Sequence, residues 1–162
     1  MDITGEISLS VPVKELPEPN KTALAELLNI SYYTAMDYDE VDWEEDWEDI
    51  KDDISSWIKS LYCPYYGEEN DSDSMDVEIE SNKISIDASE LYWDEEDDWP
   101  YIYDFKDAAE EITSVFGDII EGCNIEFVGN DFCFRHILKD GHIEIEHGRI
   151  EKVCKYTEVT SL

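Results

Sequence analysis

One stretch, residues 37–62, places apolar side chains at helical spacing among a high density of acids. At 100° per residue, its tryptophans and aliphatic residues fall within an arc of roughly 100°. They are Trp43, Trp47, Ile50, Ile54, Trp57, Ile58 and Leu61. The acids from Asp42 to Asp53 point elsewhere, so the pattern predicts an amphipathic helix with an apolar core side and an anionic outer face. We expect it to end near Cys63, because Pro64 disfavours helical backbone at the preceding residue.

The charge on this helix is dense enough to indicate a function. Eight of the twelve residues from Asp42 to Asp53 are acids, and Lys51 is the only cation among them. Twelve helical residues rise about 18 Å, which gives about one negative charge per 2.2 Å of helix axis. Duplex DNA carries one charge per about 1.7 Å. The helix therefore approaches the linear charge density of nucleic acid.

The negative charge is concentrated in the middle of the chain. The formal net charge is −32, and residues 37–121 carry 31 acids and four bases, whereas the other 77 residues carry 12 acids and seven bases. Since 42% of the residues are hydrophobic and 12% aromatic, we expect the chain to fold despite this charge. A halophilic surface would spread its acids over the whole chain, and ordinary surfaces mix the two signs. We therefore interpret the acidic faces as functional.

The first part of the chain predicts a strand and a helix of a single domain spanning residues 1–162. Residues 3–13 alternate apolar and polar side chains as a half-buried strand does, and Pro12 predicts that this strand ends at a sheet edge. A helix with Leu24, Leu27 and Leu28 on its inner side follows. Asn20 or Thr22 is its expected N-cap.

The second half predicts the rest of the sheet and a further helix. Residues 75–89 are typical of a hairpin with Ser81 and Asn82 at its turn. A second amphipathic helix is predicted over about 105–121, ended by Gly122. The last forty residues predict an antiparallel meander with arms at 123–129, 131–138, 142–148 and 149–156. The expected fold is α+β: an antiparallel sheet of N-terminal strand, central hairpin and C-terminal meander, packed with two or three amphipathic helices.

Neither a catalytic site nor a metal site is predicted, and we expect no cofactor and no enzyme activity. The chain has no phosphate-binding glycine loop and no nucleophile elbow, and nothing in the sequence marks a pair of carboxylates whose pKa values differ. Cys133 and His136 are three residues apart, and His142 and His147 are five apart, which puts the members of each pair on opposite faces of a strand. A calcium-like run from Asp71 lacks the Gly and Glu that such a loop needs.

The sequence favours a cytoplasmic protein. Its four cysteines share no disulfide-scaffold or CxxC spacing, which is typical of reduced thiols. There is no apolar run of 18 residues and no N-terminal signal pattern, so we expect neither a membrane-spanning nor a secreted chain.

A second acidic run lies within residues 88–104, which we interpret as an ordered loop or short helix. Trp93 and Trp99 flank the acids there, and aromatic side chains dominate many interface hot spots. We consider these two tryptophans candidate anchors for a basic partner.

These observations favour an acidic inhibitor that imitates DNA and occupies the basic groove of a nucleic-acid-binding protein, such as a nuclease or a defence complex. Such grooves gain much of their affinity by neutralising phosphates. The expected setting is phage or mobile-element counter-defence of the anti-restriction or anti-CRISPR type in the host cytoplasm, without direct nucleic-acid binding. The acids expected to stand in for phosphates are Asp42, Glu44, Glu45, Asp46, Glu48, Asp49, Asp52, Asp53, Asp94, Glu95, Glu96, Asp97, Asp98, Asp107, Glu110, Glu111 and Asp118.

Two alternatives use the same charge differently. An immunity protein that neutralises a basic nuclease toxin would rely on local contacts, and residues 88–104 would then matter more than total charge. A chaperone-like binder of basic proteins would more often carry its acids in a disordered tail. The mimic hypothesis, by contrast, predicts that residues 42–53, 94–98 and 107–121 form one elongated band with carboxylates about 6–7 Å apart, near the spacing of phosphates.

Overall fold

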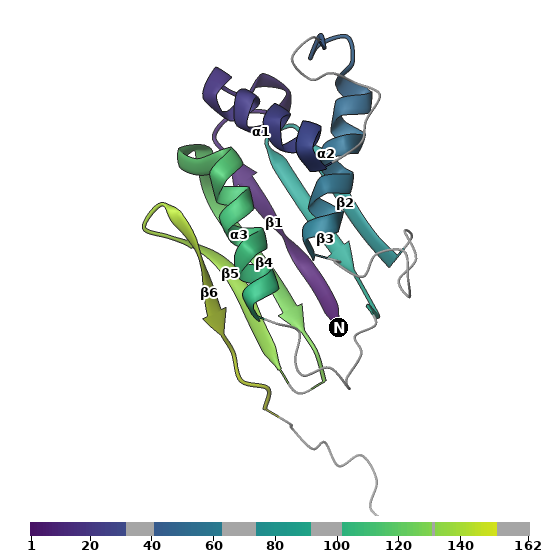
Figure 1. Cartoon of the computed structure of the whole chain (residues 1–162). Coiled ribbons are helices and arrows are strands. Elements are labelled where there is room, and N and C mark those ends of the chain that lie inside the picture. The colour runs from purple at the N-terminus through teal and green to yellow at the C-terminus, as the bar shows by residue number, and fades with distance from the viewer. Residues whose placement is uncertain (32–40, 63–73, 92–101, 131, 152–162) are drawn as a thin grey trace, which may run out of the picture.

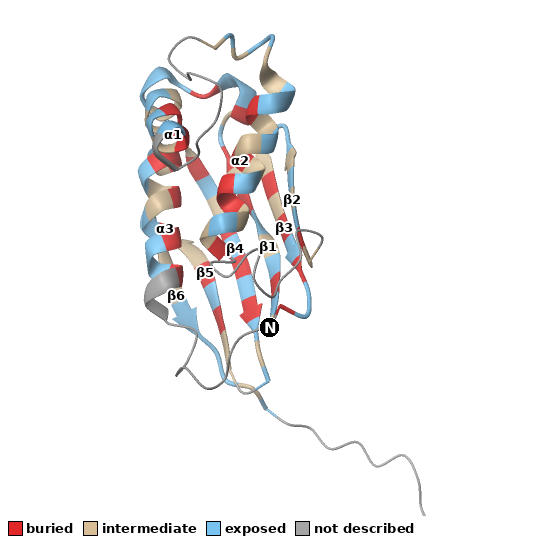
Figure 2. Cartoon of the chain, turned by 45° about the vertical axis from the view of Figure 1, so that its right-hand side comes forward, coloured by how far each residue is buried: buried red, intermediate tan, exposed pale blue. Residues whose placement is uncertain are grey.

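An antiparallel sheet with helices on one face makes up the described part of this computed structural model, which is residues 1–31, 41–62, 74–91, 102–130 and 132–151 (Figures 1 and 2). In chain order the elements are β1 (Asp2–Leu9), the 3₁₀ turn η1 (Val13–Glu15), α1 (Glu18–Ser31), α2 (Trp47–Tyr62), β2 (Met75–Glu80), β3 (Lys83–Ala88), α3 (Ile102–Phe116), the 3₁₀ turn η3 (Gly117–Ile119), β4 (Ile120–Val128), β5 (Cys133–Lys139) and β6 (His142–His147). The strands lie in the order β2-β3-β1-β4-β5-β6. The predicted α+β fold is confirmed.

β1 is a central strand, which pairs with β3 on one side and β4 on the other. Ile3, Ile7 and Leu9 are fully buried, as the alternating pattern predicts. The expectation that this strand ends at a sheet edge is wrong. β1 stops at Leu9, and Pro12 follows outside the ladder as the N-cap of η1, so proline removes no sheet hydrogen bond.

Gly5 allows β1 and β4 to pair closely at the centre of the sheet. Its φ is +154°, and a Cβ atom at this position would lie 2.0 Å from the carbonyl oxygen of Asn124 on β4. Only glycine avoids that clash.

The central hairpin is confirmed, and its turn is tied to the end of β1. Ser81 adopts a positive φ of 53° at the turn between β2 and β3. The Nδ2 of Asn82 donates to the Leu9 carbonyl oxygen at 2.8 Å, and the Leu9 N–H donates to the Asn82 carbonyl oxygen at 2.8 Å. These contacts fix the hairpin against the central strand.

α1 begins earlier than expected, so the predicted N-cap is wrong. Asn20 and Thr22 lie inside the helix, whose first turn contains Pro19, a residue that needs no N–H partner there. The Nδ2 of Asn20 instead donates to the carbonyl oxygens of Val115 at 2.9 Å and Phe116 at 3.4 Å. Asn20 therefore caps the carboxyl end of α3 rather than the start of its own helix.

The two acidic helices differ from prediction in their bounds, and α3 begins at Ile102, about three residues earlier than predicted. α2 begins at Trp47, whereas residues 43–46 form a turn and the predicted start at 37 lies outside the described residues; its end at Tyr62 is confirmed. α3 ends at Phe116 instead of 121, because Gly117 adopts a positive φ of 41° that stops a helix. Gly122, the predicted stop, lies in β4.

The first three arms of the C-terminal meander are confirmed as β4, β5 and β6. Asp140 and Gly141 both have positive φ, 50° and 82°, which is the geometry of a type I′ hairpin turn. The fourth predicted arm, 149–156, contains no strand as far as residue 151, and its remainder lies outside the described residues.

The core lies between the sheet and the three helices. α2 packs over the β2 end of the sheet and α3 lies on the β6 side (Figure 1). Aromatic rings fill the middle, with Phe127 4.4 Å from Phe134, 4.7 Å from Phe105 and 5.7 Å from Tyr62 between ring centroids. The opposite face of the sheet carries no helix among the described residues.

Candidate protein-binding surface

The acidic surface begins at a turn organised by Asp42. Its Oδ1 accepts hydrogen bonds from the backbone N–H groups of Glu44 at 2.9 Å and Glu45 at 3.2 Å. The Asp46 N–H donates to the Asp42 carbonyl oxygen at 2.8 Å. The bonds from Glu44 and then Glu45 lower the pKa of the Asp42 carboxyl. Asp42 thus holds the turn that precedes α2, and its carboxylate stays charged.

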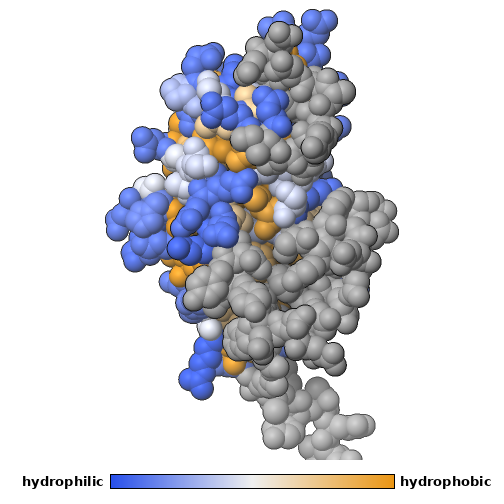
Figure 3. Space-filling model, in the orientation of Figure 1, coloured by the Kyte–Doolittle hydropathy of each residue, from blue (hydrophilic) through white to orange (hydrophobic). Residues whose placement is uncertain are grey.

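Six of the eight acids between residues 42 and 53 are exposed. They are Asp42, Glu44, Glu45, Glu48, Asp49 and Asp52, whereas Asp46 and Asp53 are half-buried. Lys51 Nζ lies 2.8 Å from Glu48 Oε2, and this hydrogen bond raises the pKa of Lys51. The side of the molecule seen in Figure 3 is hydrophilic over much of its described surface, with hydrophobic patches between the hydrophilic residues. Lys51, together with Lys14 and Lys21 near Asp42 and Glu44, offsets only part of the negative charge between residues 42 and 53.

The tryptophans of this region are only partly core residues. Trp57 is buried as predicted, but Trp43 and Trp47 are half-buried at the core margin. Lys21 Nζ lies 5.1 Å from the centroid of the Trp43 ring, within range of a cation–π contact.

A hydrogen bond joins the two acidic helices. Trp57 Nε1 on α2 donates to Glu111 Oε1 on α3 at 2.9 Å. Both helices belong to the layer on one face of the sheet (Figure 2). Glu111, expected on the outer face, is therefore half-buried and engaged within the protein. The contact fixes the orientation of α2 relative to α3.

The other predicted acids of the second helix remain exposed. Asp107 and Glu110 lie on α3, and Glu110 pairs with Lys106 at 3.2 Å. Asp118 is exposed on η3, and Glu121 is exposed on β4. The structure brings the acids of α2 and α3 into one helical layer. Asp94, Glu95, Glu96, Asp97 and Asp98, with the candidate anchors Trp93 and Trp99, lie outside the described residues, so the continuous band stays a prediction.

Sequence reasoning overlooked acids on the open face of the sheet. On β2, Asp76, Glu78 and Glu80 are exposed on the face opposite the helices, and Asp87 on β3 lies beside Asp76 in the register. Because α2 packs over β2, acids flank this end of the sheet on both faces. The signal was present in the sequence: in a hairpin with one buried face, the residues that alternate with the apolar ones point to solvent.

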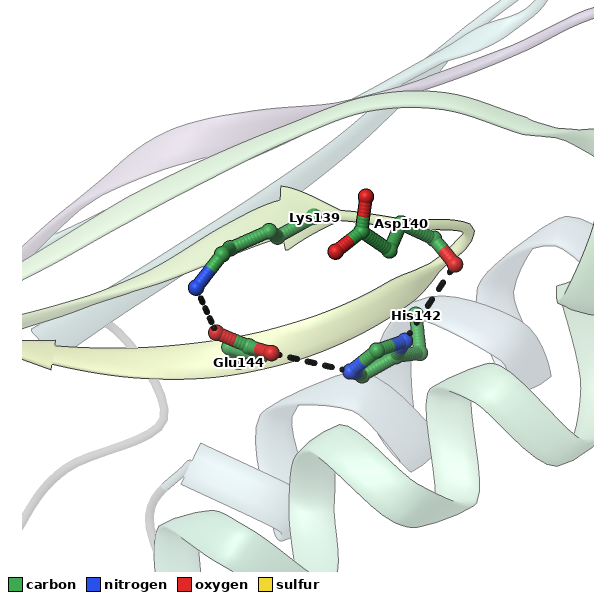
Figure 4. A network of polar contacts seen from close by, with 4 residues as sticks. All are labelled: Lys139, Asp140, His142 and Glu144. Carbon is green, nitrogen blue, oxygen red and sulfur yellow. Dashed lines mark hydrogen bonds and ion pairs between the residues drawn. The ribbon is translucent and has the colours of Figure 1, made fainter.

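The hairpin of β5 and β6 carries paired charges instead. Glu144 accepts from Lys139 Nζ at 3.0 Å and lies 3.0 Å from His142 Nε2 (Figure 4). The contact with Lys139, and then that with His142, lowers the pKa of Glu144. Arg135 pairs with Glu146 directly across the two strands at 2.5 Å.

A buried polar group links this hairpin to α2. His136 is fully buried on β5 and its Nδ1 lies 3.3 Å from the Tyr62 hydroxyl. Its Nε2 has no hydrogen-bond partner among the described residues. Burial lowers the pKa of His136 to about 4 and raises that of Cys123 to about 12. Cys133 is half-buried on the opposite face from His136, as predicted. Within the described residues no three His, Cys, Asp or Glu side chains gather as a metal site.

Comparison with protein families, with curated proteins and with solved structures finds no match to this chain. In the described residues, none of the helices has the length and apolar character needed to cross a membrane.

Proposed function

We propose that this protein is an inhibitor that imitates nucleic acid and occupies the basic groove of a nucleic-acid-binding protein. A phage or mobile-element counter-defence role, against a nuclease or defence complex of the host, follows from that proposal. The observation that carries it is the exposed acidic surface of α2 and its preceding turn. Among the described residues, its six exposed acids form one ion pair, Glu48 with Lys51, and Lys14 and Lys21 lie near Asp42 and Glu44.

The geometry of this surface supports the proposal in two ways. Neighbouring outward side chains on a helix have Cβ atoms about 5–6 Å apart, close to the carboxylate spacing that mimicry requires. The surface is also held in place, by the Asp42 turn at one end and by the Trp57–Glu111 hydrogen bond along the helix. A surface ordered before binding loses less entropy when a partner engages it.

The test is capture of the partner and its release by salt and DNA. The protein is immobilised and exposed to host lysate, and the retained proteins are identified by mass spectrometry. We expect a basic nucleic-acid-binding protein that is displaced by duplex DNA. Its affinity should fall steeply between about 0.05 and 0.2 M salt, because charge neutralisation drives such binding.

A matched pair of variants separates this surface from total charge. One variant carries Glu44→Gln, Glu45→Gln, Glu48→Gln and Asp52→Asn, and the other carries Asp76→Asn, Glu78→Gln, Glu80→Gln and Asp87→Asn. Each variant removes four negative charges, but only the first should fail to bind the partner. Equal loss in both variants would show that net charge alone attracts it. Salt-insensitive binding that DNA cannot displace would contradict mimicry and favour the immunity-protein alternative.

A further inference from the structure

β6 is an edge strand of the sheet formed by the described residues. β6 pairs with β5, and among the described strands it has no partner on its other side (Figure 1). Lys139 pairs with His142 across the two-residue turn, so alternate residues from His142 onward bond to β5. The N–H and C=O groups of Ile143 and Ile145 consequently point away from β5. Such a row is a template for another strand.

A groove runs along this edge between β6 and α3. Its strand side consists of four consecutive residues, 142–145, and its helix side includes Ala109 and Thr113, with the Lys106–Glu110 ion pair beside them. Consecutive residues of a strand alternate between its two faces. A groove that touches all four therefore follows the edge of the strand. The two isoleucines are only half-buried there.

Charge along this edge is balanced, in a protein whose net charge is −32. Lys139 and His142 both contact Glu144, and Arg135 contacts Glu146. Two copies of the chain can thus approach through β6 with less repulsion than through their α2 surfaces.

We propose that a second copy of this chain pairs antiparallel with β6, about a twofold axis at Glu144, and so extends the sheet. In this register Ile143 lies opposite Ile145 of the second copy on the helix side, and their outward backbone groups form the new ladder. His142 lies opposite Glu146 of the second copy on the open face, a complementary pair that occurs twice. This register also places Glu144 opposite Glu144 of the second copy, where Lys139 pairs with each carboxylate. An axis at Ile145 would instead create two like-charge pairs, with Glu144 opposite Glu146 twice.

This inference is independent of the proposed function. α2 packs at the β2 end of the sheet, so pairing through β6 leaves the acidic surfaces of both copies accessible. We also expect salt to affect partner binding and self-association in opposite directions. Partner binding should weaken with salt, whereas self-association should strengthen, because screening relieves the repulsion between two strongly anionic molecules.

The experiment is sedimentation equilibrium of the full chain over a range of concentrations at about 0.05 and 0.5 M NaCl. We expect a monomer–dimer equilibrium with more dimer at the higher salt. Amide hydrogen exchange at high and low protein concentration should show protection of Ile143 and Ile145 that grows with the dimer fraction.

Substitutions at position 142 test the register. His142→Lys should tighten the dimer and His142→Glu should weaken it, each by about three- to tenfold, because the pair with Glu146 is present twice. The controls Asn124→Lys and Asn124→Glu place a charge of the same sign on the exposed open face of β4, away from the interface. They should shift the dimerisation constant less than their counterparts at position 142.

Three outcomes would overturn the proposal. The first is a monomer at every concentration and salt tested. In that case, concentration-independent protection of Ile143 and Ile145 would show that the chain's own following segment, 152–162, occupies the edge. The second is a dimer that responds equally to substitution at 124 and 142. The third is a dimer whose Ile143 and Ile145 amides exchange as fast as in the monomer.

Discussion

The α2 surface and the β5–β6 hairpin use acidic residues in opposite ways. On the hairpin, Glu146 lies directly across from Arg135, and Glu144 is held by Lys139. On α2 and its preceding turn, the six exposed acids form a single ion pair among the described residues, with Lys51, and Lys14 and Lys21 lie near Asp42 and Glu44. The acids of the hairpin are therefore paired with bases, whereas most acids of α2 and its preceding turn lie beside other acids. The one-sign surface is a local property, and overall composition does not explain it.

The two arrangements have different energetic consequences. Exposed pairs between strands stabilise a sheet modestly, whereas like charges at i, i+4 on a helix destabilise it by a few tenths of a kcal/mol per pair. The α2 surface thus costs stability that the hairpin does not. Such a cost is expected where the charge serves binding rather than folding.

The largest expected effect is on binding by the α2 surface. Glu44→Gln, Glu45→Gln, Glu48→Gln and Asp52→Asn together should weaken partner affinity about 100-fold, because four charge contacts with a basic groove are lost. The melting temperature at neutral pH should stay equal or rise slightly, because repulsion is removed. Affinity is measured by titration calorimetry and stability by calorimetric melting.

A control on the hairpin is Glu144→Gln with Glu146→Gln, which removes two charges rather than four. It should lower the melting temperature and leave partner binding intact. A markedly lower melting temperature of the α2 variant would show that its acids stabilise the fold. Unchanged partner affinity would show that the acids of this surface do not contribute to binding.

The second effect concerns His136, which connects the hairpin to Tyr62 at the end of α2. The folded-state pKa is about 4, against about 6.5 for an unperturbed imidazole, so the unfolded state binds more protons between these values. The contribution of His136 to the free energy of unfolding is fully present above pH 6.5. It falls by about 3 kcal/mol as the pH drops to 4. Denaturant unfolding at several pH values measures it.

His136→Leu is the control for that measurement. The other titrating groups remain in the variant, so the difference between the two pH profiles isolates the imidazole. Identical profiles between pH 6.5 and 4 would show that His136 becomes charged without cost in the folded state.

Much of the fold could be predicted from local pattern. Alternation identified β1 and the central hairpin, and the Asp140-Gly141 turn identified β5 and β6. What failed depended on tertiary contacts or single backbone angles. Asn20 resembles an N-cap in sequence, but its amide reaches a different helix, and Gly117 rather than Gly122 adopts the helix-ending conformation.

The candidate site could be predicted only as a set of acids. Helical periodicity identified the outward acids of α2, of which Glu48, Asp49 and Asp52 are exposed and Asp53 is half-buried. It missed the Asp42 turn, because the spacing of apolar residues does not show which carboxylate accepts hydrogen bonds from backbone N–H groups. It also predicted that Glu111 lies on the outer face, because the sequence does not show that the indole of Trp57, on another helix, donates a hydrogen bond to it.

The third effect concerns the link between α2 and α3. Trp57→Phe removes the donor to Glu111 and leaves a half-buried carboxylate without that bond, which should cost about 2 kcal/mol of unfolding free energy. Glu111→Gln keeps an acceptor oxygen and should cost less. Partner affinity should also fall in Trp57→Phe if the relative orientation of the helices matters. Unchanged stability in both variants would show that the contact is not formed in solution.

The smallest effect tests whether the hairpin pairs contribute to folding. A double-mutant cycle of Arg135→Ala and Glu146→Ala should give a coupling energy of about 0.2–1 kcal/mol, because the two side chains are directly opposite on a solvent-exposed face. The coupling should shrink as salt is added, since screening weakens exposed pairs. A parallel cycle for Glu48→Ala and Lys51→Ala on α2 should show a smaller coupling, because Lys51 also interacts with Asp52 and is shared among several acids. Equal coupling in the two cycles would remove the energetic difference between hairpin and helix.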